Sequence, residues 1–142
     1  MNLLIRLISP YTEANLLLGV FSTLKEAQTA HTEYISQYKD GKKKDPWKEQ
    51  AYKGEVDLDE DVVILEDIPE IGVGHNEAEV YIVSTYTEGF GQIIREFNAI
   101  CGSEEIAVAT VSELESKLES NFPEYCEFEK VVVGELLRDE RL

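Results

Sequence analysis

Apolar positions in the first half of the chain change their period at Thr23. Before it, residues 2–10 and 15–21 are short, mostly apolar runs, which are typical of buried strands. After it, apolar residues recur at three- and four-residue steps, which predicts an amphipathic helix of about four turns. Thr23 and Glu26 have the spacing of a capping box, in which two side chains satisfy free backbone N–H groups at a helix start. Two later runs are also predicted to be strands: 52–58 and 61–68.

The second half shows a similar order of strands and helix. A helix is predicted over 112–120, because Ser112 and Glu115 repeat the capping-box spacing and apolar residues follow at helical steps. Strands are predicted over three other runs: 79–86, 106–111 and 128–137.

Residues 92–101 fit two interpretations. Their apolar residues fall at i, i+1, i+4, i+7 and i+8, which favours a helix that Gly102 would end. A strand in the same place would match the first half of the chain better. Both interpretations stay open here, and the spacing favours the helix.

Short stretches of the two halves resemble each other. Residues 8–13 align with 83–88, and residues 62–68 align with 131–137, at offsets that differ by a few positions. Changing offsets are expected when the loops of a duplicated fold gain or lose residues. We therefore predict an internal duplication.

The predicted fold class is α+β, with two related β-β-α-β-like units. Each unit is expected to form an antiparallel sheet with helices packed on one face. Gly72 and Gly74 indicate a linker between the units. The predicted boundaries are 1–69 for the first unit, 70–78 for the linker and 79–142 for the second unit.

The composition adds a large negative charge. The 142 residues include 29 Asp and Glu but only 13 Lys and Arg, which gives a formal net charge of -16. This charge argues against direct nucleic-acid binding, because contacts to phosphates need a basic surface. No apolar run approaches the roughly 18 residues of a membrane-spanning helix, and the N-terminal residues do not resemble a signal peptide. We expect a cytoplasmic protein that binds neither nucleic acid nor membrane.

Side chains that could carry catalysis or hold a metal are few and poorly grouped. His31 and His75 are the only histidines, and no second ligand stands at a metal-binding spacing from either. Cys101 and Cys126 match no metal or redox motif and are expected to be reduced thiols, unless the fold brings them together as a disulfide. We predict no metal, no cofactor and no enzymatic activity.

The segment from Leu17 to Ala27, read with the acidic run 55–60, resembles a family of small uncharacterised domains in bacterial and bacteriophage proteins. The resemblance rests on an apolar-Gly-Val-Phe-Ser strand end, a capped helix with Glu-Ala in its first turn, and an acidic strand. It covers about residues 3–68, whereas the second half has Ala-Thr-Val at 109–111 in place of the Gly-Val-Phe-Ser turn. The resemblance implies a fold and a phage or bacterial origin, and it carries no catalytic residue.

Carboxylates crowd the second half of the chain, and this is its strongest functional signal. Charge this dense repels itself and weakens the compact state, a cost that solubility alone does not require. Carboxylates spaced along a rigid sheet can occupy a basic groove, as phosphates do. We therefore expect a non-enzymatic, phage-encoded anti-defence protein that inhibits a basic partner such as a nuclease or nucleic-acid-binding complex. The predicted partner-binding residues are Glu113, Glu115, Glu119, Glu124, Glu127 and Glu129.

An alternative function is a small-molecule binding module, with a nucleotide-like ligand in a pocket between the two units. Aromatic walls and a few backbone donors are typical of such pockets. A homo-oligomer is compatible with either function. The residues predicted for the pocket are Tyr11, Tyr81, Tyr86, Gly89, Phe90 and Gly91.

Overall fold

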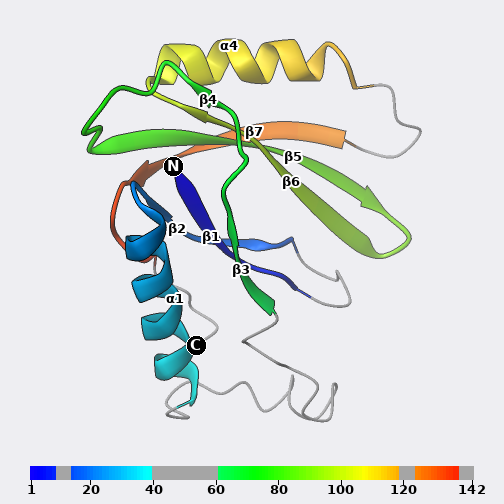
Figure 1. The fold of residues 1–142 in the computed structure, drawn as a ribbon. Helices are drawn as coiled ribbons and strands as arrows, with labels where there is room; N and C mark the ends of the chain where they lie inside the picture. The colour runs from blue at the N-terminus through cyan, green and yellow to red at the C-terminus, as the bar shows by residue number, and fades with distance from the viewer. Residues whose placement is uncertain (9–13, 40–60, 119–123, 138–142) are drawn as a thin grey trace.

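The computed structural model describes residues 1–8, 14–39, 61–118 and 124–137, and it confirms the predicted α+β class (Figure 1). Two sheets pack face to face, and each has a helix on its outer face. The order of layers is therefore helix, sheet, sheet, helix. None of the described helices is long and apolar enough to cross a bilayer.

The first sheet, sheet A, has three antiparallel strands in the order β2-β1-β3. Helix α1 (Leu24–Lys39) covers its outer face through Ala27, Ala30 and Tyr34, which pack on Leu4 of β1. Thr23 caps this helix as predicted, because its Oγ1 accepts a hydrogen bond from the Glu26 N–H at 3.2 Å. The strands are β1 (Asn2–Arg6), β2 (Leu16–Phe21) and β3 (Val62–Leu65).

The second sheet, sheet B, has four strands in the order β4-β6-β5-β7. Its long strands are antiparallel, and the short β4 runs parallel to β6. Helix α4 (Glu104–Glu115) covers the outer face through Ala107, which is fully buried. The strands are β4 (Glu70–Ile71), β5 (Glu79–Gly89), β6 (Gln92–Cys101) and β7 (Glu124–Val132).

The largest buried cluster lies between the two sheets. Leu3 and Val20 of sheet A meet Val80, Ile82 and Ile100 of sheet B there, all of them fully buried. Alternation along each strand sends the intervening residues to the outer face, under a helix. Residues from both halves of the chain thus share one core. The boundaries predicted for the two units, at residues 69 and 79, remain a prediction.

The helix favoured over residues 92–101 is wrong, because this segment is strand β6. A two-residue turn, Phe90 and Gly91, joins it to β5, and both residues have positive φ angles of 52° and 73°. Two positive φ angles define a type I′ turn, whose twist suits an antiparallel hairpin. The pairing with β5 therefore decides the structure of this segment.

The strand predicted at 106–111 is also wrong, because this run lies inside α4. The helix begins after Ser103, whose side chain accepts a hydrogen bond from the Ile106 N–H at 3.2 Å. Ser112, predicted as the cap, is therefore an interior residue of this helix. The hydroxyl of Ser103 and the acidic first turn outweigh the β-branched residues of this run.

The other predicted strands of the described chain occur with shifted ends, whereas the helix predicted over 112–120 shares only residues 112–115 with α4. The predicted linker 70–78 contains β4, which pairs with the end of β6. The predicted strand at 52–58 lies outside the described residues. In sheet A, β1 lies between β2 and β3, and α1 connects β2 to β3. In sheet B, β5 lies between β6 and β7, and α4 connects β6 to β7. The internal duplication itself stays a prediction.

Candidate functional site

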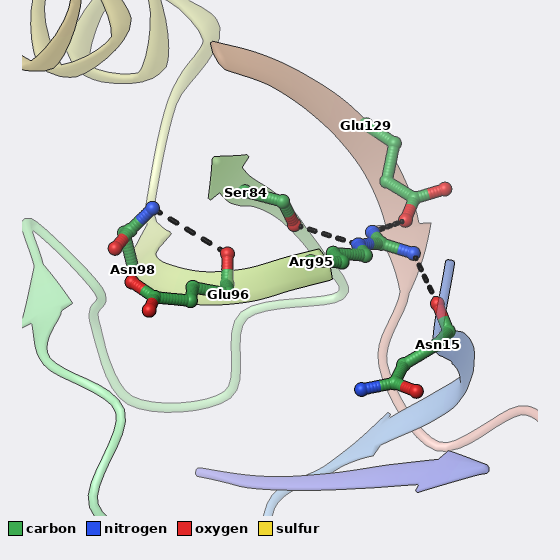
Figure 2. Close-up of polar contacts among 6 residues, drawn as sticks. All are labelled: Asn15, Ser84, Arg95, Glu96, Asn98 and Glu129. Carbon is green, nitrogen blue, oxygen red and sulfur yellow. Dashed lines mark hydrogen bonds and ion pairs between the residues drawn. The ribbon is translucent and has the colours of Figure 1, made fainter. Parts of the chain in front are cut away.

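The guanidinium of Arg95 joins sheet B to the start of β2 (Figure 2). Its Nε donates to Ser84 Oγ at 3.0 Å, and its Nη1 donates to the Asn15 carbonyl oxygen at 3.3 Å. Its Nη2 forms an ion pair with Glu129 Oε1 at 2.7 Å, although the Arg95 side chain is only 9% exposed. These bonds join β5, β6 and β7 to one another and to the first half of the chain.

Aromatic rings surround the same guanidinium. Its central carbon lies 4.4 Å from the ring centroid of Phe97 and 5.3 Å from that of Tyr86. Tyr86 stacks on Tyr125 with centroids 4.9 Å apart, and the Tyr125 hydroxyl donates to Glu88 Oε1 at 3.2 Å. Cation–π contacts of this kind strengthen when the cation is withdrawn from water. The cluster therefore stabilises the part of sheet B between Ser84 and the turn that joins β5 to β6.

Burial perturbs the two stacked phenols. Loss of water contact raises the pKa of Tyr86, and the Arg95 charge opposes this rise only in part. Burial also raises the pKa of Tyr125, and its bond to the Glu88 carboxylate adds to that rise. Both phenols therefore stay protonated at neutral pH, and Tyr125 acts as a hydrogen-bond donor.

The structure places several of the predicted partner-binding carboxylates on or beside strand β7. Glu115 of α4 and Glu127 of β7 both lie close enough to the Cys126 thiol to raise its pKa, after burial as the main cause. Glu124 and Glu129 belong to the same strand β7, at the edge of sheet B. Glu115 lies on the α4 side of sheet B, whereas Glu127 and Glu129 lie on its opposite face, so the two sets of carboxylates flank the same edge strand from its two sides.

These carboxylates differ in their partners. Glu129 is ion-paired with Arg95, and Glu113 is paired with Lys117 one helical turn away, at 3.1 Å. Glu115 and Glu127 are exposed, and no cation among the described residues forms a salt bridge with either. The sixth predicted residue, Glu119, lies outside the described part of the chain.

The residues predicted for a ligand pocket do not converge. Tyr81 packs edge-on against Phe128 under α4, whereas Tyr86 lies on the opposite face of β5, beside Arg95. Gly89, Phe90 and Gly91 form the tip of the hairpin, and Phe90 is 90% exposed there. The remaining residue, Tyr11, lies outside the described chain.

One hollow of the described structure lies beside Tyr86, and a wider one lies away from all the described residues predicted for the pocket. A cavity of about 80 Å³ beside Tyr86 and Arg95 is far smaller than the several hundred cubic ångströms of a typical ligand site. A wider groove of about 670 Å³ lies elsewhere, between α1 and the segment Gly134 to Leu136. Exposed side chains of both signs, Lys25 and Glu26, line it.

The described residues form neither a metal site nor a disulfide. No group of three or more His, Cys, Asp or Glu residues in those ranges could hold a metal ion. Cys101 pairs with Tyr81 and Cys126 with Thr85, on opposite sides of β5. Four residues along a strand amount to about 14 Å, so the two thiols cannot form a disulfide within one chain.

Sequence reasoning missed Arg95 as the centre of this cluster. The available signal was a single cation, Arg95, which stands with Glu96 between the apolar residues Ile94 and Phe97 in a strongly acidic chain. A cation on the buried face of a strand must be paired, and the adjacent Glu96 points to the opposite face, so the partners of Arg95 had to lie on other parts of the chain. His31 behaves as expected of a packed residue, because its Nε2 lies 2.9 Å from the Val62 carbonyl oxygen.

No known protein family, curated protein or solved structure matches this chain. The site must therefore be interpreted from its own geometry.

Proposed function

We propose that this protein is a non-enzymatic binding protein, and that a basic partner docks on the carboxylates of β7 and α4. The observation that carries this proposal is the pair Glu115 and Glu127. Both are exposed, both lie near Cys126, and neither has a salt-bridge partner among the described residues. They lie on opposite faces of sheet B, so each leaves uncompensated negative charge on its own side of the β7 edge, and this charge favours association with a basic partner.

The proposed partner class is a nuclease or another protein with a groove for nucleic acid. Glu127 and Glu129 repeat at about 7 Å along an extended strand, which is close to the separation of neighbouring phosphates along a nucleic-acid chain. Inhibition would follow because a groove occupied by these carboxylates cannot hold its substrate. A role as a phage-encoded anti-defence protein, acting in the cytoplasm, belongs to this proposal.

The internal duplication is also proposed here, on the shared order of strands. In both halves a hairpin precedes the helix, and the third strand returns beside the first. A duplicated frame would explain how so short a chain builds two sheets that cover each other. Solved relatives that contain a single unit would support it.

The test compares two double variants with the same charge change. Glu115→Lys with Glu127→Lys reverses the proposed site, and Glu33→Lys with Glu66→Lys reverses exposed carboxylates elsewhere. Each protein serves as bait in affinity capture from a bacterial lysate, and the dissociation constant of the captured basic protein is measured by titration. We expect the first variant to weaken binding at least tenfold and the second by less than twofold. Equal losses would mean that only net charge matters and would refute the proposed site.

A further inference from the structure

The described chain covers or interrupts three of its four sheet edges. At the β2 edge, Gly134 N–H donates to the Val20 carbonyl at 2.8 Å, and Leu137 N–H donates to the Leu18 carbonyl at 2.7 Å. The chain that follows β7 therefore occupies this edge of sheet A. The opposite edge, β3, is only four residues long, and His31 contacts its Val62 carbonyl.

The β6 edge of sheet B is also interrupted. Strand β4 pairs with its end at Ile100 and Cys101. Farther along, the register shifts so that Asn98 bulges out between Phe97 and Ala99. The Asn98 side chain then donates to the Glu96 carbonyl oxygen at 3.4 Å (Figure 2). Bulges and side-chain caps of this kind prevent another strand from adding to an edge.

Strand β7 is different. Its nine residues pair with β5 in an unbroken register from Glu124 to Val132. Among the residues that the structure describes, no strand pairs with its outer side. An edge of this length presents a row of backbone N–H and C=O groups that can hydrogen-bond to an incoming strand.

We propose that β7 takes up an extended segment of a basic partner as a fifth strand of sheet B. The inference rests on the proposed function and adds the mode of binding. Alternation places Glu127 and Glu129 on the same face as Val131, toward sheet A, and Phe128 on the face under α4. A matching segment therefore alternates Lys or Arg with apolar residues, because cross-strand neighbours of opposite charge stabilise the pairing.

A second copy of this chain fits the edge less well. Antiparallel pairing of two β7 strands centred on Phe128 would place Glu127 opposite Glu129 of the other copy. Like charges directly across a strand pair are destabilising, and each copy carries a net charge of -16. The basic segment is the occupant that the charge pattern favours.

The test uses the intact protein and the synthetic peptide VKVRVKV, with its isomer KKRVVVV as a control of identical composition and charge. Two further versions of VKVRVKV carry backbone N-methyl groups, one on its valines and the other on its basic residues. In a strand, these two sets of N–H groups point to opposite edges. Binding is measured by fluorescence polarisation, and protection of β7 amides by hydrogen exchange. Glu127→Lys is compared with Glu33→Lys.

We expect VKVRVKV to bind at least tenfold more tightly than KKRVVVV and to protect β7 amides. One methylated version should bind like the parent peptide, and the other should lose at least tenfold. Glu127→Lys should weaken binding at least fivefold, and Glu33→Lys should leave it unchanged. Equal binding of the two isomers, or no protection of β7, would overturn strand addition while leaving the proposed function to the capture experiment. A dimer in sedimentation whose β7 amides are already protected would make a second copy the occupant and would also overturn it.

Discussion

Replacing Arg95 by Met tests whether its cluster holds sheet B together. Met has a similar length and keeps contacts with the rings of Phe97 and Tyr86, but it removes the charge and the donors. Ser84 is 1% exposed, so its hydroxyl would lose a partner that water cannot easily replace. Glu129 is 46% exposed, so water can solvate its carboxylate once the ion pair is gone.

The expected loss follows from these exposures. Loss of one hydrogen bond by the buried Ser84 hydroxyl costs about 1 kcal/mol, a half-exposed ion pair contributes about 0.5–1 kcal/mol, and the lost cation–π contacts contribute about 0.5–1 kcal/mol. We therefore expect Arg95→Met to lower the free energy of unfolding by about 2–3 kcal/mol. Glu129→Gln keeps a hydrogen-bond acceptor and removes one charge, so its expected loss is smaller, about 0.5–1 kcal/mol.

Urea unfolding followed by circular dichroism measures these losses, and a double-mutant cycle measures the coupling of the two residues. The double variant should fall short of the summed losses by about 0.5–1 kcal/mol, because both single changes remove the same ion pair. Glu113→Gln is the matched control, since it breaks a pair whose two side chains are 67% and 68% exposed. A loss for Arg95→Met no larger than that of this control would refute the structural role of the cluster.

Two further predictions concern the same hairpin. Phe90 has a positive φ of 52°, which Asn adopts more readily than a bulky residue, so Phe90→Asn should raise stability by about 0.5–1 kcal/mol in the same urea assay. A loss of stability would show that the ring packs on the fold. Because burial raises the pKa of Tyr86 and Tyr125 above 10.0, the folded state keeps them protonated where the unfolded chain ionises. Their contribution to stability is therefore complete below pH 10.0 and declines as the pH rises above it. In an absorbance titration of the folded protein, Tyr86→Phe and Tyr125→Phe should each remove signal only from the part of the curve above pH 10.0, and a loss of signal below pH 10.0 would contradict this.

The sequence was informative where the hydrophobic period was simple. Helix α1 and the strands before it were predicted because a capped, 3.6-residue period follows two apolar runs. Strand β6 was misinterpreted because its bulge at Asn98 changes the alternation. Ile93 and Phe97 precede the bulge and Ile100 follows it, so residues of one face are spaced four and then three apart, as in a helix. Only the pairing with β5 decides between a helix and a strand here, and that pairing depends on residues outside the segment 92–101.

The acidic candidate site was predicted more completely than the cluster that supports it. Runs of glutamate are visible in any sequence, whereas the partners of Arg95 are Asn15, just before β2, and residues of β5 and β7, which meet only in the fold. The face that a carboxylate occupies was also out of reach, because the register of β7 could not be assigned from its own residues. This is why Glu129, which binds Arg95, and Glu127, which does not, could not be told apart from the sequence.

The buried cation and the acidic edge depend on each other. Glu88, Glu127 and Glu129 lie on the same side of sheet B as Tyr86, where their negative charges would otherwise repel one another. Arg95 lies among them in a site with little water, so its attraction is screened less than that of a surface cation. Without Arg95, the carboxylates would repel one another, and added salt would screen this repulsion. The free energy of unfolding of Arg95→Met should therefore rise more steeply with ionic strength than that of the native protein. The cluster therefore allows one edge of a stable sheet to carry the carboxylates that a basic partner would recognise.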